Sequence, residues 1–403
     1  MASLKARLPQ IVSGPPSSAS LADGDRVRQF SVAITATIDQ ICNRTGAAPP
    51  DIRVLHVGGG MFGALPMASI KAGATVMVVD PDERVCKEVH DNCASAAAPG
   101  QLTIEKVHSM HHVTDHKYDL VVCDAFGPTI TDKGFFVCAY DLRARGLLRA
   151  YPAFDSEPLF IPSEATMVLT VYHCPVFSVQ NWAMHMNSCT STLFMHMSAQ
   201  PKDKSTQPKT DDPKDKSTQL KFQHDSGSSG VRFDKGVCTP VCAPVCVATA
   251  KFGSREDALV RWGGGVIQVD VSHLEPSHHM APAHSYVALL EWGLELIPFP
   301  EHERRGPAAQ VTMVGNAINL LTNISPADKL ARWACWGHLY TVMPQPVDPT
   351  IPLRVSTAFK TNGDVSITLT PIEEGGDPTV SIEAIPFSET KLTKLCEKMF
   401  LAC

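Results

Sequence analysis

The chain has little of what marks a membrane, secreted or nucleic-acid-binding protein. A membrane helix needs about 20 consecutive apolar residues, and no apolar run in the sequence comes near that length. The net charge of −6 gives no support for a nucleic-acid-binding surface. The first 22 residues contain no acid, as in transit peptides, but three prolines interrupt them and no secretory apolar segment is present. We therefore expect a cytoplasmic protein.

The chain also lacks paired cysteine spacings and defined metal motifs. Its 13 cysteines are odd in number and mostly stand singly within apolar runs, which argues against a disulfide framework. The segment CTPVCAPVC (238–246) and two histidine clusters (108–116 and 272–284) are the only candidates for metal binding. None of the three has a recognised ligand spacing, so we expect structural cysteines, solvated loop histidines and no metal site.

What is present describes a globular protein with two domains. The 403 residues are 44% hydrophobic and 19% charged, and this length exceeds one ordinary core. Helix and strand patterns alternate in the first part of the chain, which predicts a parallel sheet with right-handed crossovers. The expected helices span 25–43, 64–72, 83–94 and 135–150, and the expected strands span 53–57, 75–80, 102–107 and 118–123.

The character of the sequence changes near Ile161–Pro162. Short β-rich runs separated by Gly, Pro, Asn and Asp follow this point, and they predict an antiparallel sandwich or barrel. Within that part, residues 198–230 repeat PKDKSTQ and contain almost nothing apolar. Such a composition cannot bury enough surface to offset chain ordering, so we predict a disordered insertion there.

The stretch VLHVGGGMFGALPMASIKAGATVMVVDPD contains a strand, a glycine-rich turn, a helix and a second strand that ends on an acid. Gly58, Gly60 and Gly63 match G-x-G-x-x-G, and Asp80 closes the second strand. Glycines allow close backbone approach to a ligand, and the acid can accept from two ribose hydroxyls. NAD-dependent enzymes and S-adenosylmethionine-dependent methyltransferases share both needs, and a purely structural turn is the third possibility.

Several motifs together resemble those of the protein arginine methyltransferase family. The stretches that carry the resemblance are DRVRQF, VLHVGGGMFGALPMASIKAGA (with one extra residue in the turn), YDLVVCDAFG, FIPSEATMVLTVY, HSYVALLEWGLELI and WACWGHLYTV. The resemblance implies an α/β Rossmann-like (class I methyltransferase) domain followed by an antiparallel β-barrel domain. The expected divisions are a disordered N-terminus (1–24), the Rossmann-like domain (25–160) and the barrel domain (161–403), with a dimerisation arm at about 177–197.

The resemblance also implies roles for single residues. Arg28 matches the arginine that grips the methionine carboxylate of S-adenosylmethionine, while Gly58, Gly60, Gly63 and Asp80 match the rest of the cofactor site. The family clamps the substrate guanidinium with two glutamates on one loop.

The clamp positions and other family residues depart from the pattern. Asp124 stands at the first clamp position, and Lys133 or its neighbour Asp132 at the second. A lysine there repels a guanidinium by about 4 kcal/mol at about 4 Å for an effective dielectric near 20. The Thr-His-Trp loop reads Ala-Cys-Trp, the acid of the first strand is His56, and the N-terminal lid helix and the adenine-binding acid have no counterpart. These departures predict a degenerate clamp and weak or lost binding of S-adenosylmethionine.

The combined expectation is a catalytically inactive paralogue that resembles the prozyme subunits of trypanosomatid type I arginine methyltransferases. Such a subunit forms a heterodimer or heterotetramer with a catalytic paralogue, activates it, and meets arginine/glycine-rich substrates only indirectly. Two alternatives stay open: an active arginine methyltransferase with an atypical clamp (Asp124 and Asp132), and a spermidine-synthase-like or dinucleotide-binding enzyme. In spermidine synthases a small β domain precedes the sheet and no long barrel follows it, so the long β-rich region after Ile161 argues against them.

Overall fold

The computed structural model describes about half of the chain. The described residues are 24–107, 117–124, 126, 135–155, 157–173, 218–220, 223–224, 239–253, 261–270, 272, 274, 286–300, 303–304, 306–311, 314–315, 339–342, 351–359, 365–372 and 385–386. Among them, no helix combines the length and the apolar character that crossing a bilayer requires.

A long amphipathic helix precedes the first sheet. Helix α2 (Gly24–Thr45) buries one face, and the residues on it are Arg26, Gln29, Phe30, Ala33, Ile34, Thr37, Ile38 and Ile41. Positions three or four apart share a helix face, so this spacing gathers them on the buried face of α2. Gly46, with a φ of 73°, ends the helix and donates its N–H to the carbonyl of Cys42 at 2.8 Å.

The first sheet has five parallel strands in the order β3-β2-β1-β4-β5. Its elements in chain order are η1 (Pro49–Asp51), β1 (Arg53–Val57), α3 (Gly60–Lys71), β2 (Thr75–Asp80), α4 (Glu83–Cys93), β3 (Leu102–Lys106), β4 (Leu120–Cys123), α5 (Phe135–Ala144), η3 (Pro152–Phe154) and β5 (Leu159–Ile161). This sheet confirms the Rossmann-like expectation and fits a methyltransferase fold. The fifth strand, β5, was missed in the sequence because only three residues form it.

The strands after β5 are antiparallel, as the turn-separated runs predict. They are β6 (Glu164–His173), β7 (Thr218–Leu220), β8 (Gln223–His224), β9 (Thr239–Pro240), β10 (Val245–Lys251), β11 (Arg261–Trp262), β12 (Gly265–Ile267), β13 (Tyr286–Glu295), β14 (Val314–Gly315), β15 (Leu339–Val342), β16 (Leu353–Phe359), β17 (Val365–Pro371) and β18 (Ile385–Pro386), with η8 at Gly306–Gln310. One sheet runs β18-β11-β10-β6-β13-β15-β8, with β9 on β6 and β14 on β13, and a second runs β12-β16-β17-β7. Closure of these sheets into a barrel stays a prediction.

Two short strands fall inside the segment that composition predicts to be disordered. Strand β7 pairs with β17, and β8 pairs with β15. For residues 218–220 and 223–224 the prediction of disorder is therefore wrong. The physical reason is that a strand at a sheet edge is held by main-chain hydrogen bonds, which composition does not report. The rest of 198–230 lies outside the described residues.

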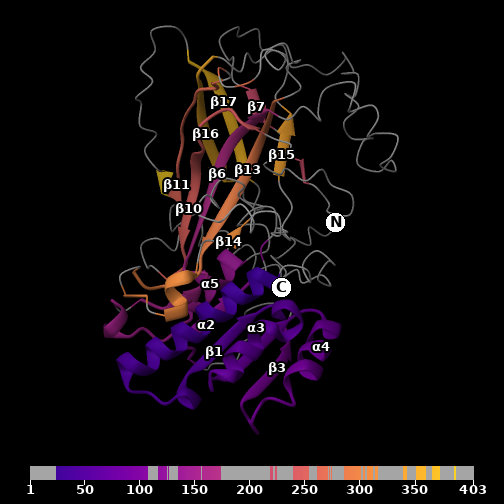
Figure 1. Cartoon of the computed structure of the whole chain (residues 1–403), viewed down its shortest axis with the longest axis vertical. Helices are drawn as coiled ribbons and strands as arrows, with labels where there is room; N and C mark the ends of the chain where they lie inside the picture. The colour runs from indigo at the N-terminus through magenta and orange to yellow at the C-terminus, as the bar shows by residue number, and fades with distance from the viewer. Residues whose placement is uncertain are drawn as a thin grey trace, which may run out of the picture.

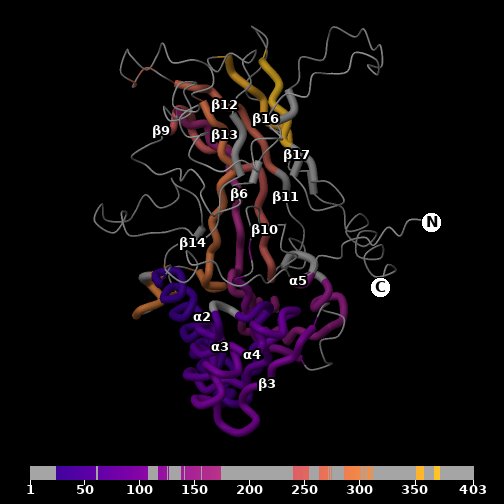
Figure 2. The backbone as a smooth tube through the Cα atoms, turned by 90° about the vertical axis from the view of Figure 1, so that its right-hand side faces the viewer, coloured from indigo at the N-terminus to yellow at the C-terminus, as the bar shows by residue number. Residues whose placement is uncertain are grey.

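The two parts of the chain share one hydrophobic core. In Figure 1 the parallel sheet and its helices lie at one end of the molecule, and the long strands β6, β10 and β13 extend from it. The same arrangement is seen after a quarter turn in Figure 2. A continuous cluster of buried residues joins Phe30 of α2 to Trp292 of β13, while α3 and α4 pack on the parallel sheet around a second, smaller cluster.

Candidate functional site

Three residues with possible chemical roles lie at the carboxyl ends of three neighbouring strands of the parallel sheet. Strands β2, β1 and β4 end in register, so Asp80, Gly58 and Asp124 lie side by side at the carboxyl edge. The strand order reverses direction between β1 and β4. Open α/β sheets bind their ligands at such a switch point, so this edge is the candidate site.

The glycine turn of residues 58–63, which joins β1 to α3 and includes the first residues of that helix, contains left-handed backbone. Gly58 has a φ of 92° and Gly63 a φ of 93°, values that favour glycine. Phe62, which is not a glycine, has a φ of 56°. The N–H of Gly58 donates to the carbonyl of Val79 at 2.8 Å, which ties the turn to β2. The matched Gly60 is the first residue of α3, so the helix begins earlier than expected.

The Asp80 carboxylate is engaged by the chain itself. Its Oδ2 accepts the N–H of Gly59 and its Oδ1 accepts the N–H of Asp82, each at 2.8 Å. The residue is fully buried. Asp80 therefore holds the glycine turn and the start of α4 in place, and its carboxylate is shielded from solvent.

A buried ion pair lies at the same edge. Nη1 of Arg26 in α2 is 3.5 Å from Oδ2 of Asp124, and the two side chains are 5% and 12% exposed. Burial raises the pKa of Asp124 above its ordinary value, and the nearby Arg26 opposes that rise. The carboxylate of Asp124, which the sequence predicts at the first clamp position, is thus already next to a guanidinium from its own chain.

Arg28 does not join this pair. Its side chain is 56% exposed and forms an ion pair with Asp25 at 2.7 Å, within the first turns of α2. The arginine that α2 directs inward is Arg26, which the sequence prediction missed. The signal was available, because Arg26 lies four residues before the buried Phe30 and so shares its face.

His56, where the resemblance leads us to expect an acid, is part of the packing between β1 and α3. It is buried on β1, and its Nε2 lies 2.9 Å from Oγ of Ser69 in α3. Burial lowers the pKa of His56 to about 3, so the ring is neutral at physiological pH. Its described contact joins the sheet to α3.

The segment after β4 is anchored on the antiparallel sheet. The N–H of Phe126 donates to the carbonyl of Asp124 at 3.0 Å. The ring of Phe126 packs on Trp292 of β13 and on Phe252, with centroids 5.7 and 6.4 Å apart. The position of Asp124 therefore depends on contacts from both parts of the chain.

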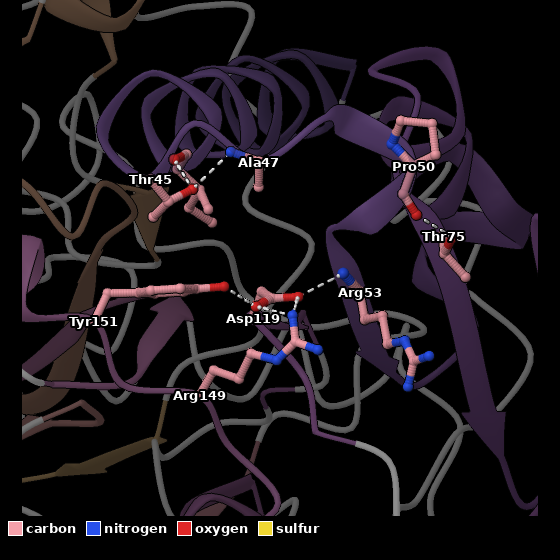
Figure 3. Close-up of polar contacts among 9 residues, drawn as sticks. Thr45, Ala47, Pro50, Arg53, Thr75, Asp119, Arg149 and Tyr151 are labelled. Atoms are coloured by element: carbon pink, nitrogen blue, oxygen red, sulfur yellow. Dashed lines mark hydrogen bonds and ion pairs between the residues drawn. The ribbon is translucent and has the colours of Figure 1, made fainter.

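A second polar cluster lies at the opposite edge of the sheet (Figure 3). Asp119, just before β4, accepts the N–H of Arg53 at 2.7 Å, Nη1 of Arg149 at 3.1 Å, and the hydroxyl of Tyr151. Burial and the hydrogen bond to Asp119 raise the pKa of Tyr151. This cluster joins the starts of β1 and β4 to the segment that leads to β5, away from the switch point.

Other expected site residues lie outside the described residues. They are Asp132, Lys133, the arm at 177–197 and nearly all of both histidine clusters. Within the described part of the chain, no three His, Cys, Asp or Glu side chains are grouped to hold a metal ion. Cys242 and Cys246 are free thiols there. Burial raises the pKa of Cys242 to about 11, which disfavours the metal-binding thiolate.

Comparisons with known proteins return solved structures only. No family model matches the chain, and no curated protein matches it. It is similar to a chain of the Trypanosoma brucei PRMT1 enzyme–prozyme heterotetrameric complex with AdoHcy, at 14% identity over 87% of this chain and 91% of that one, with a TM-score of 0.45. It is also similar to Arabidopsis thaliana protein arginine methyltransferase 10, at 14% identity over 87% and 93% of the two chains, with a TM-score of 0.49. Likenesses of this size do not determine activity, ligand or assembly.

Proposed function

We propose that this chain is an arginine-methyltransferase-related protein that has lost catalysis and acts as a prozyme, the inactive subunit that activates a catalytic paralogue. The motifs and the parallel sheet with its glycine turn support the relation to methyltransferases. The proposed assembly is a heterodimer or heterotetramer in the cytoplasm, in which arginine/glycine-rich substrates bind to the catalytic subunit.

The observation that carries the proposed loss of catalysis is the buried pair of Arg26 and Asp124. A substrate clamp needs an ionised carboxylate that is open to an incoming guanidinium. Asp124 is 12% exposed and lies 3.5 Å from a guanidinium of its own chain. Because burial also raises the pKa of Asp124, its carboxylate is a weaker partner for a second cation.

The proposed weakness of S-adenosylmethionine binding follows from Asp80 and Arg28. Both oxygens of Asp80 accept backbone N–H groups, and Arg28 points to solvent. Arg26 takes over the inward position, where it is the residue that would meet a cofactor carboxylate. We expect this cofactor to bind at best weakly to the isolated chain, and calorimetry measures the affinity.

The test is a methylation assay of an arginine-rich peptide with the chain alone, with the catalytic paralogue alone, and with both. We expect activity only, or far more strongly, in the mixture. Asp124→Asn and Asp132→Asn, in preparations that circular dichroism shows to be folded, should leave the mixture active, because the chain supplies an interface and no clamp. Asn is preferred to Ala at 124 because its amide oxygen still faces the buried Arg26.

Disruption of the proposed arm is the complementary variant. Trp182→Ala with Phe194→Ala should abolish activation while the purified chain stays folded by circular dichroism. If instead the aspartate variants lose activity and the arm variant keeps it, the chain is an active methyltransferase with an atypical clamp.

A further inference from the structure

The glycine turn is held down on α4 by two consecutive contacts. Nδ2 of Asn92 donates to the carbonyl of Phe62 at 2.9 Å. The thiol of the next residue, Cys93, donates to the carbonyl of Gly63 at 3.3 Å. Two neighbouring carbonyls of the turn are thus bound by two neighbouring residues of α4.

Proline inside α3 makes the first of these contacts possible. In a regular α-helix the N–H of residue 66 would donate to the carbonyl of residue 62. Residue 66 is Pro66, which has no N–H. The carbonyl of Phe62 therefore lacks its regular helical donor and accepts from Asn92.

The backbone of the turn stores strain that this contact offsets. Phe62 has a φ of 56°, and the left-handed conformation costs a residue other than glycine about 1–2 kcal/mol. A net hydrogen bond contributes about 1 kcal/mol. The bond from Asn92 is therefore large enough to decide how firmly the turn stays in place.

Close packing shows that the turn lies directly on α4. A Cβ atom on Gly59 would lie 2.1 Å from Cγ1 of Val85, and one on Gly63 would lie 2.8 Å from Sγ of Cys93. Real Cβ atoms do not approach so closely, so only glycine fits at both positions. From this position the N–H of Gly59 reaches Oδ2 of Asp80.

We propose that Asn92 and Cys93 form a latch that keeps the turn of residues 58–63 closed on Asp80. A nucleoside ligand donates its cis-diol to Asp80 only after this latch opens. This inference rests on the proposed function, because it takes the carboxyl edge to be a vestigial nucleoside site.

The test combines hydrogen exchange with binding of S-adenosylhomocysteine. Asn92 is exposed, so Asn92→Ala removes the donor with little risk to folding, and Asn92→Asp does so at constant size. Each variant should speed amide exchange in residues 58–63 by about 5-fold and strengthen binding by about the same factor. Asp91→Ala, on the exposed face one residue earlier, is the matched control and should change neither.

Unchanged exchange in both Asn92 variants would show that the side chain does not hold the turn. Faster exchange without tighter binding would show that the turn does not control access, and binding undetectable in every protein would equally overturn the latch. Micromolar binding by the unmodified chain would contradict the proposed cofactor loss, while the ratio between variant and wild type would still test the latch.

Discussion

Two arginines only two positions apart on α2 have opposite environments. The Arg26 side chain is 5% exposed and pairs with Asp124, whereas the Arg28 side chain is 56% exposed and pairs with Asp25 one turn away. Residues two positions apart on a helix are separated by roughly 200° of rotation about its axis. When one of them faces the core, the other therefore faces water. The orientation of α2 thus decides which arginine belongs to the site.

This contrast predicts unequal effects on stability. Arg26→Met leaves Asp124 buried without its cation, and breaking a buried pair costs about 3–5 kcal/mol. Arg28→Met removes a surface pair and should cost less than about 1 kcal/mol. Urea denaturation of the two variants measures both values. Similar losses from the two substitutions would contradict the placement of Arg26.

His56 predicts a dependence of stability on pH. Its pKa is lowered from 6.5 to about 3 in the folded chain, so between these values the unfolded chain binds a proton that the folded chain excludes. Stability from this group is complete above about pH 6.5 and falls as the pH drops, by about 2 kcal/mol between about pH 7.5 and pH 5. His56→Gln, whose amide can still bond to Ser69, should remove that part of the loss. Urea denaturation of the wild type and of His56→Gln at about pH 7.5 and about pH 5 measures the contribution of His56. If both proteins lose the same stability between the two pH values, the His56 ring is not a buried neutral group.

At the scale of elements, α2 is also joined to the antiparallel part of the chain. Arg44 in its last turn pairs with Glu303 and donates to the carbonyl of Ala153 at 2.7 Å. Its guanidinium carbon lies 4.9 Å from the ring centroid of Phe154 and 5.6 Å from that of Phe299. One side chain therefore contacts both the segment before β5 and the segment after β13.

Arg44→Met should lower the free energy of unfolding by about 2 kcal/mol, because it removes the stacking, the carbonyl bond and the ion pair together. Glu303→Gln keeps an acceptor and removes only a partly exposed charge, so it should cost about 0.5 kcal/mol. Thermal or urea unfolding of both variants gives the comparison. Equal losses would mean that the ion pair alone accounts for the contact.

At the scale of the whole molecule, the insertion of 198–230 has two unequal parts. The polar repeat spans 201–219. Its last two residues belong to β7, which together with β8 completes the edges of two sheets. Composition identifies the polar repeat, but only the fold shows that β7 and β8 pair with other strands.

Replacing 198–217 with a Gly/Ser segment of equal length should therefore leave unfolding and partner binding unchanged. The same replacement of 218–224 should lower the melting temperature by several degrees, because β17 and β15 lose their edge partners. Calorimetry of both variants and a pull-down with the proposed catalytic paralogue measure these effects. A large loss from the first replacement would show that the repeat itself is structured when the partner is bound.

Local patterns in the sequence were sufficient for the elements of the first sheet. The predicted strands 53–57 and 75–80 coincide with β1 and β2, and the helical stripe ending at Ile41 lies within α2. The glycine turn and Asp80 could also be located, because a strand, a turn and an acid at fixed spacing form a local pattern. Strand β5 was missed, since three residues are too few to show a period.

Local sequence patterns predict that helices alternate with parallel strands, that antiparallel strands follow Ile161, and that glycines and an acid meet at one sheet edge. Contacts between distant segments were needed to show that Arg26 rather than Arg28 faces Asp124, that the N–H of Gly59 donates to Asp80, and that β7 and β8 pair with distant strands. The physical reason is the distance along the chain between the residues that interact. Periodicity reports which side of an element is apolar, whereas ion pairs, buried carboxylates and edge pairing depend on residues brought together from distant parts of the chain.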